Sequence, residues 1–341
     1  MADLIRSCHL KSGERMDVLR VAAPCGDWAD RICDFMYVRH PEYTNCSWHH
    51  DCRRIVAGDY ETVSNDVFFM GMAGGEIAGT TWYATAADSG ELGTFGRVVT
   101  AVSQRRKGIS TVLSQMALDD FRAHGGTVMH LGTSLRNPAH LIYEAIGYRD
   151  INSVPGNGTV MRWSDPETDF PDGYYAPGRP ISRRTLHHGD LARVEALVNL
   201  PHWFMKDYSL GVCGSTPFEG QFFDLMAWVD RGEVGEALVT DQGRLVGLAY
   251  TAPTAIGGGA QDHVRVLECL VHPSYAGEEA GLVRVAADAA RASKLLSHAS
   301  SGDTQKCAAL EEAGFEREAV LRGALQDEAG PLDLVVYSLG K

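Results

Sequence analysis

The stretch GTFGRVVTAVSQRRKGISTVLSQMALDDFRAHG, residues 93–125, decides the fold of the first half of the chain. Its β-branched beginning predicts a strand over 93–102, and the apolar spacing of its second part predicts a helix over 108–125 that ends at a glycine. The short basic loop SQRRK lies between them at 103–107. A helix that follows a strand so closely presents the unbonded amides of its first turn beside the end of that strand.

Similar signals extend outward from this stretch in both directions. Strand-like runs cover 16–23, 66–85, 127–134 and 158–163, helical spacing covers 26–38 and 137–148, and a polar, irregular stretch runs from His40 to about Ser64. The pair Gly74-Gly75 predicts a hairpin within the second run. A segment rich in Pro, Gly and Asp then predicts a linker over 166–180, between domains at 1–165 and 181–341. Because the second half repeats the order of strands and helices, we expect one architecture used twice.

The charge of the chain limits its partners. The 341 residues carry a formal net charge of −13, of which −3 falls on residues 1–165 and −10 on the remainder. An acidic surface repels nucleic acid and anionic membranes and attracts cationic small molecules, although the same acidity also serves solubility alone. No apolar run has the length of a membrane span or a signal peptide, so we expect a soluble cytoplasmic protein without nucleic-acid or membrane partners.

The cysteines do not form a recognisable metal motif. The chain has eight cysteines and no CxxC pair. Its densest group is CSWHHDC at 46–52, where two Cys and two His could ligate zinc. The spacing fits no finger or ribbon pattern, so we expect buried thiols and no metal.

The basic loop has the chemistry of an anion site. The start of a helix offers free amides and a partial positive charge, and Gly108 and Ser110 leave that backbone open to a phosphate. Arg105, Arg106 and Lys107 add positive charge around it. The sequence is neither GxxxxGK[ST] nor GxGxxG, and the alternative is a solvated basic loop before an ordinary helix.

The spacing Arg105-x-x-Gly108-x-Ser110, after a strand and opening a helix, resembles the acetyl-CoA loop of the GNAT superfamily of N-acetyltransferases. Downstream, NPAHLIYEAIGYRDI at 137–151 resembles the last motif of that family, although Asn137 is one residue closer to Tyr143 than the family pattern has it. The resemblance implies an α/β (α+β) fold of two GNAT-like domains, each a mixed, mostly antiparallel sheet flanked by helices. It implies acetyl-CoA as cosubstrate, bound by Thr100, Ala101, Val102, Arg105, Arg106, Lys107, Gly108, Ile109, Ser110, Asn137 and Tyr143.

The second half resembles the same family in its core and its ending, but its site is altered. Ala276 stands where the first Arg or Gln of the loop belongs, and Glu278 and Glu279 follow where cations and glycine would be. Two carboxylates would repel a pyrophosphate. Leu310 stands in the place of the tyrosine. The whole resembles tandem GNAT proteins, of which mycothiol synthase is one type, and we expect the first half to be catalytic.

The resemblance places Tyr143 beside the thioester sulfur, where its hydroxyl could protonate the departing thiolate. The general base is open. Many family members carry a Glu on the strand ahead of the loop, but Arg97 stands there and cannot accept a proton. The other candidates, besides a chain of waters, are His49, His50, Asp51, Glu91 and His130. Arg97, His50 and, in the second half, Glu268 are candidates for substrate binding.

The leading hypothesis is an acetyl-CoA-dependent N-acetyltransferase that acts on a small amine by direct transfer in a ternary complex. The acidic second half favours a polyamino acceptor such as an aminoglycoside or aminosugar antibiotic or its precursor, and so antibiotic biosynthesis or resistance. The alternatives are a mycothiol-synthase-like acetylation of a cysteinyl amine and a non-catalytic CoA-binding sensor. The sequence leaves a homodimer open.

Overall fold

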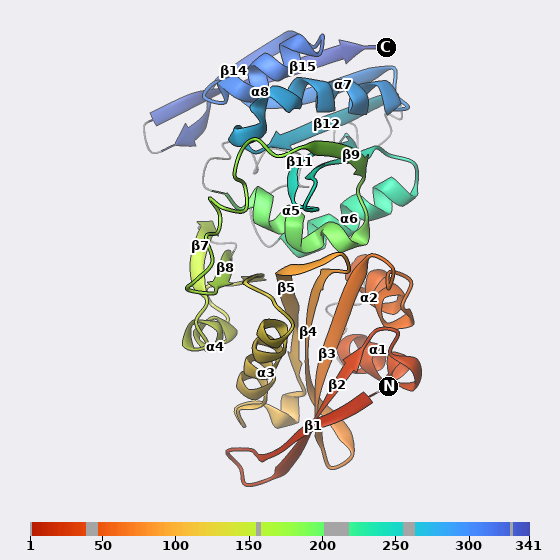
Figure 1. The fold of residues 1–341 in the computed structure, drawn as a ribbon, viewed down its shortest axis with the longest axis vertical. Helices are drawn as coiled ribbons and strands as arrows, with labels where there is room; N and C mark the ends of the chain where they lie inside the picture. The colour runs from red at the N-terminus through yellow and green to blue at the C-terminus, as the bar shows by residue number, and fades with distance from the viewer. Residues whose placement is uncertain (1, 39–46, 155–157, 201–217, 255–262, 328–329) are drawn as a thin grey trace. The chain divides into compact units, whose positions relative to one another are not determined.

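A computed structural model describes residues 2–38, 47–154, 158–200, 218–254, 263–327 and 330–341 (Figure 1). The chain divides into two compact units. Unit 1 contains residues 1–168 and 188–195, and unit 2 contains residues 169–187 and 196–341. Within the described residues, no helix combines the length and the apolar character that crossing a membrane requires.

Unit 1 is built on a sheet with the strand order β1-β2-β3-β4-β5-β6-β8-β7. All neighbouring strands are antiparallel except β5 and β6, which are parallel. The strands are β1 Ala2–His9, β2 Arg15–Ala22, β3 Ser64–Ala73, β4 Glu76–Ala86, β5 Ser89–Thr100, β6 Val128–Thr133, β7 Arg149–Val154 and β8 Gly158–Ser164.

The helices of unit 1 lie on both faces of this sheet. The longest, α3 (Ile109–Ala123), packs on β3, β4 and β5, and α1 (Ala29–Cys33) and α2 (Ser47–Ala57) lie on the opposite side (Figure 1). Residues 1–168 also contain the turns η1 (Gly26–Trp28) and η4 (Val102–Gln104), the π-helix η2 (Asp34–Val38) and the short helix α4 (Ala139–Ala145).

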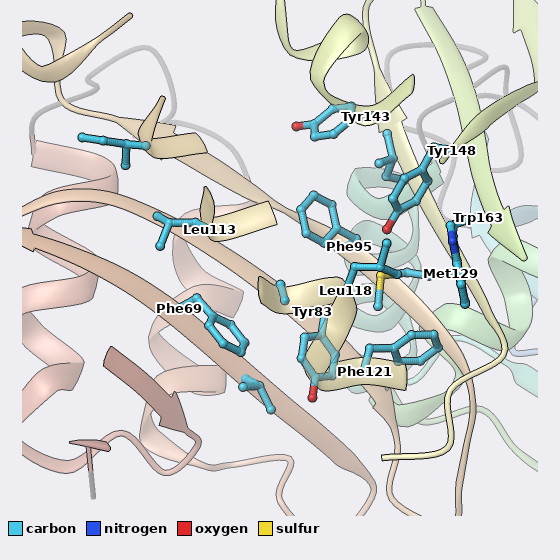
Figure 2. Packing of buried hydrophobic residues seen from close by; sticks show 14 of the residues in the cluster. Phe69, Tyr83, Phe95, Leu113, Leu118, Phe121, Met129, Tyr143, Tyr148 and Trp163 are labelled. Atoms are coloured by element: carbon cyan, nitrogen blue, oxygen red, sulfur yellow. The ribbon is translucent and has the colours of Figure 1, made fainter. Parts of the chain in front are cut away.

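The core of unit 1 sits between α3 and the sheet. Aromatic rings from the strands, from α4 and from the turn after it meet the apolar face of α3 there, as Figure 2 shows for Phe95, Trp163, Tyr143 and Tyr148. Phe121 of α3 lies with its ring edge against Tyr83 and Trp163. The apolar residues of α3 recur with a helical period of about 3.6 residues and so share one face of the helix. That face is buried on the sheet, as the period predicts.

Three expectations about the first half need correction. Residues 47–57, expected to be irregular, form α2, so His49, His50 and Asp51 belong to a helix. The strand expected over 93–102 ends at Thr100, and Val102 opens the η4 turn. Strands β1 and β7 are additions to the expected elements. The hairpin at Gly74-Gly75 is confirmed, with both glycines at the positive φ that a tight turn requires.

Unit 2 repeats the sheet of unit 1 without its first strand. Its order is β14-β15-β13-β12-β11-β10-β9, and only β12 and β13 are parallel. The strands are β9 Ile181–Thr185, β10 Gly235–Thr240, β11 Leu245–Pro253, β12 Val264–Val271, β13 Lys294–Ser300, β14 Glu316–Asp327 and β15 Gly330–Gly340. The helical segments after residue 180 are η5 His188–Asp190, α5 Leu191–Val198, α6 Phe218–Asp230, η7 Pro273–Glu278, α7 Glu279–Ala289 and α8 Thr304–Glu312. The expected fold class is confirmed.

Candidate active site

The two parallel strands of unit 1 separate partway along their length. β5 and β6 pair only from Leu92 with Val128 to Thr94 with His130. β5 continues to Thr100 paired with β4 on its other edge, and β6 continues to Thr133 paired with β8. Beyond Thr94, no pairing joins β5 to β6 in the described part of the chain. Main-chain groups of residues 95–100 therefore face the β5–β6 separation, where they could bond a ligand.

β5 carries a bulge inside this separation. Thr80 of β4 pairs with Val99 and Trp82 pairs with Gly96, so that Arg97 and Val98 stand opposite Thr81 alone. Arg97 has a φ of 52°, and its carbonyl accepts a hydrogen bond from the Thr80 hydroxyl at 3.2 Å. Bulges bend a strand and redirect its groups, and they are frequent beside active sites.

The separation leads to the start of α3. The hydroxyl oxygens of Thr100, the last residue of β5, and Ser110, in the first turn of α3, lie 2.7 Å apart. Gly108 precedes the helix with a φ of 87°, a conformation that favours glycine. The Gly108 carbonyl accepts from the amide of Val112 at 3.1 Å. The amides of 109–111 precede that bond and have no partner within the helix, which makes this end of α3 suited to an anion.

The three cations of the loop differ in their surroundings. Lys107 bonds the Glu14 carboxylate and, at 2.9 Å, the side-chain oxygen of Gln104. Its charge is therefore neutralised within the protein, which the sequence did not indicate. Arg105 and Arg106 are exposed, and Arg105 Nε donates to the Thr100 carbonyl at 3.4 Å. Arg106 has a φ of 65°, so its amide and those that follow turn in a concave backbone path of the kind that binds anions.

Tyr143 of α4 lies where the strands begin to part. Its ring meets Phe95, the first residue of β5 beyond the paired segment, edge-on with a centroid distance of 5.8 Å (Figure 2). Burial raises the pKa of the Tyr143 hydroxyl, so that the phenol keeps its proton. No hydrogen bond of this hydroxyl occurs within the described residues. A neutral phenol beside the separation could donate a proton there.

Asn137 precedes the helix that carries Tyr143 and bonds its first residue. Its side-chain oxygen accepts from the Ala139 amide at 3.0 Å, so this oxygen is occupied within the protein.

The candidate bases do not gather in one place. Glu91 lies at the far end of β5 from Thr100, where its carbonyl accepts from the Thr127 amide at 2.9 Å. Burial, with a smaller contribution from the charge of Arg162, lowers the pKa of His130 to about 3. That imidazole is neutral at physiological pH and a weak base. Asp51 is buried and accepts from the Tyr60 hydroxyl at 3.4 Å. For His49 and His50 the structure describes the backbone and not the side chains.

Arg97 points into the interior of unit 1. Its side chain is buried, donates to the Tyr37 hydroxyl at 2.9 Å and lies over the ring of Trp82, 4.8 Å from the centroid. Trp82 in turn donates to Asp66 at 2.9 Å. The guanidinium thus belongs to a buried polar cluster on the α1 and α2 side of the sheet. Sequence patterns did not indicate this cluster, because its members are far apart along the chain.

In unit 2, side chains of the protein itself lie in the region that corresponds to the β5–β6 separation. β12 and β13 pair only from Val264 with Lys294 to Val266 with Leu296, so these strands also separate. Glu268 of β12, two residues past that point, forms an ion pair with Lys306 of α8, and both side chains are almost fully buried. The other contact of Glu268 is with the amide of Cys269, at 2.9 Å. Glu268 is therefore an internal residue whose charge is paired within the protein.

A second set of contacts joins α8 to the end of β12 and to the start of α7. Gln305 of α8 donates to the Val271 carbonyl at the end of β12, at 3.1 Å, and to Glu279 at the start of α7, at 2.6 Å. Burial raises the pKa of Glu279 to about 7. The ladder between β11 and β12 also runs from Gly247–Val271 to Pro253–Arg265 without a shift. Unit 2 thus lacks the bulge that β5 has in unit 1.

Removing one partner of the buried ion pair is expected to destabilise unit 2. Lys306→Met leaves the Glu268 carboxylate buried and unpaired, which costs about 3–5 kcal/mol. The double variant Lys306→Met with Glu268→Leu removes both charges and is expected to regain most of that loss. Urea denaturation of the full chain measures the difference, and equal midpoints for the wild type and Lys306→Met would contradict it.

Among the described residues, one group could in principle hold a metal ion. His140, Glu144 and Asp150 have ligand atoms within 4.8 Å of one another. His140 Nε2 already contacts both oxygens of Asp150 at 3.1 Å, so direct contacts account for the group without an ion.

The model of the acetyltransferase (GNAT) family matches residues 31–148. A search of curated protein sequences with the whole chain gives no match.

Among solved structures, the chain is similar to an N-acetyltransferase from Staphylococcus aureus Mu50, with 15% identity, a TM-score of 0.40, and coverage of 47% of this chain and 98% of that one. It is similar to a Salmonella typhimurium protein described as an acetyltransferase and solved with its cofactor acetyl-CoA, with 15% identity, a TM-score of 0.39 and coverage of 47% and 93%. It is also similar to a chimera of the spermidine N-acetyltransferase from Vibrio cholerae, with 18% identity, a TM-score of 0.35 and coverage of 47% and 95%.

The family match spans the β5 bulge, the loop at Gly108 and the helix of Tyr143. Residues 31–148 therefore match a GNAT acetyltransferase domain, and the enzymes of that family transfer the acetyl group of acetyl-CoA.

Proposed function

We propose that unit 1 transfers the acetyl group of acetyl-CoA to the primary amine of a small molecule, by direct attack within a ternary complex. The observation that carries this proposal is the continuity of the β5–β6 separation with the start of α3. The separation offers main-chain groups to an extended thioester arm, and the amides at 109–111 offer an anion site at its end.

The reaction requires unit 1 to hold the donor, to leave its carbonyl carbon open to the amine and to supply a proton. Residues 95–100 hold the thioester so that its carbonyl carbon is open to the amine, and the loop at Arg105, Arg106 and Gly108 holds the diphosphate. The amine nitrogen bonds to that carbon while the C–S bond breaks. The Tyr143 hydroxyl gives its proton to the departing thiolate, and the proton that the amine loses passes to water or to a base not yet assigned.

The acceptor is proposed to be a cationic, amine-rich small molecule of the aminoglycoside or aminosugar type. The acidic balance of the chain supports this class, because a negative field concentrates cations near the protein. Burial of Arg97 among Tyr37 and Trp82 agrees with it, since a cation there is withdrawn from the surface that an amine would approach.

Unit 2 is proposed to bind no acetyl-CoA. The Glu268–Lys306 pair and Gln305 occupy the region between the separated strands, and Glu279 stands at the start of the helix that would hold the diphosphate. The regular ladder between β11 and β12 supports the same conclusion.

Calorimetric titration with acetyl-CoA, combined with an assay of released thiol over a panel of amines, tests the proposal. We expect one acetyl-CoA per chain, and turnover with polyamino sugars in preference to a cysteinyl amine. Two acetyl-CoA per chain would overturn the assignment of unit 2. Binding without thiol release from any amine would favour a CoA-binding sensor, and faster turnover of the cysteinyl amine would favour the mycothiol-synthase-like reaction.

A further inference from the structure

α4 depends on few contacts for its position. The helix has seven residues, and only His140 and Tyr143 among them are buried. A helix this short is not stable by itself in water, so its placement depends on what its buried side chains contact. The ring of Tyr143 packs on Phe95 and Tyr148 in the aromatic core. Ala139 and Ile142 are partly buried against the same core, and His140 adds the buried polar contact of the helix.

His140 connects α4 to the hairpin of β7 and β8. Its Nε2 lies 3.1 Å from both carboxylate oxygens of Asp150 on β7. Asp150 Oδ1 also accepts from the hydroxyl of Thr159 on β8, at 2.7 Å. Thr159 is fully buried and pairs with Thr133 at the end of β6. A continuous path of hydrogen bonds thus runs from α4 to the strand that borders the β5–β6 separation.

The carboxylate on the other side of the imidazole makes a weaker contact with His140. Glu144 of α4 is exposed, and its nearest oxygen lies 3.7 Å from His140 Nδ1. This distance is too long for a hydrogen bond, so Asp150 is the acceptor that orients the ring.

We infer that His140, held by Asp150 and Thr159, is a positioning residue that sets the place of the Tyr143 hydroxyl for proton transfer to the thiolate. The inference rests on the proposed role of Tyr143. The two residues are three apart on one helix, so they lie on the same side of it. The Tyr143 hydroxyl has no hydrogen-bond partner within the described residues, so its place depends on where the helix is held.

A double-mutant cycle on kcat tests the inference. His140→Leu removes the bond to Asp150 and is expected to lower kcat about 10- to 100-fold in an otherwise wild-type chain, because small misplacements of a reacting group are costly. The same change is expected to have little effect on kcat in a Tyr143→Phe background, where no hydroxyl remains to be positioned. The KM for acetyl-CoA is expected to stay the same.

The outcomes distinguish this inference from the proposed function. If both single changes lower kcat and the effects multiply, His140 acts on the fold in general and the inference is wrong while the role of Tyr143 stands. If Tyr143→Phe alone leaves kcat unchanged, the acid assignment fails and the inference fails with it. If His140→Leu alone leaves kcat unchanged, only the inference fails.

Further variants keep the test decisive where His140→Leu does not fold. His140→Gln keeps a side-chain N–H that can reach Asp150, and it is expected to recover part of kcat. Asp150→Asn is expected to lower kcat in the wild-type background and not in Tyr143→Phe. His124→Gln, a matched change at the exposed end of α3, is expected to leave kcat unchanged. Treatment with EDTA is expected to change neither kcat nor the melting temperature, and a loss of either would identify the His140 group as a cation site instead.

Discussion

The Ser110→Glu variant is expected to bind acetyl-CoA at least about 100-fold more weakly than the wild type, because its carboxylate would stand beside the proposed diphosphate site at the start of α3. Two like charges about 4 Å apart near a protein surface repel by about 4 kcal/mol, and each 1.4 kcal/mol is tenfold in affinity. A carboxylate in the first turn favours the helix itself, so the melting temperature is not expected to fall for that reason. Calorimetric titration and thermal denaturation of the full chain measure both quantities.

Two controls separate charge from general disturbance. Ser110→Ala removes the contact with the Thr100 hydroxyl without adding charge, and it is expected to weaken binding by less than about tenfold. Thr304→Glu places the same charge at the first residue of α8 in unit 2, and it is expected to leave binding unchanged. Should Ser110→Glu bind acetyl-CoA as the wild type does, the diphosphate is not held at this helix.

The Tyr143→Phe variant is expected to lose about 100- to 10,000-fold in kcat with little change in the KM for acetyl-CoA, because it removes a general acid and keeps the ring. The packing of the ring against Phe95 needs no hydroxyl, so the fold is expected to persist. Burial holds the pKa of Tyr143 above its ordinary value of 10.0, so the wild-type rate is not expected to decline below pH 10 through loss of this proton. Single-turnover kinetics with acetyl-CoA and a reactive amine measure the effect.

Tyr148→Phe is the matched control. Tyr148 lies in the same aromatic cluster, and its buried hydroxyl has no hydrogen-bond partner within the described residues (Figure 2). Removing an unsatisfied buried hydroxyl is expected to leave kcat unchanged and to keep or raise the melting temperature. Equal rates for Tyr143→Phe and Tyr148→Phe would mean that Tyr143 is a packing residue and that another group protonates the thiolate.

The regular elements of the first half could be predicted where one period dominated the sequence. The alternating and β-branched runs of β3 and β4, the glycine pair between them and the amphipathic face of α3 are local signals, and each predicted its element. α2 was missed because polar and charged residues dominate SWHHDCRRIVA, although Cys52, Ile55 and Val56 recur at helical spacing and are buried. β1 was missed for a related reason, since its side chains are mostly exposed and its pairing with β2 supplies the order.

The chemistry of the loop was also readable from the chain. Gly108 was expected to open a helix and does so, and Tyr143 and the loop fall within the matched family region. Charges are visible in a sequence but their partners are not. The sequence therefore did not indicate that Lys107 pairs with Glu14 or that Glu268 pairs with Lys306.

The sequence by itself determined the strand–loop–helix with a glycine before the helix, the repeated order of strands and helices and the acidic balance, because these depend on neighbours along the chain or on composition. Only the tertiary structure decided where β5 leaves β6, which charges are neutralised, and how His140 and Asp150 hold the helix of Tyr143. These features join residues that are distant in sequence, and their energies depend on burial and on distances of a few ångströms that no local pattern encodes.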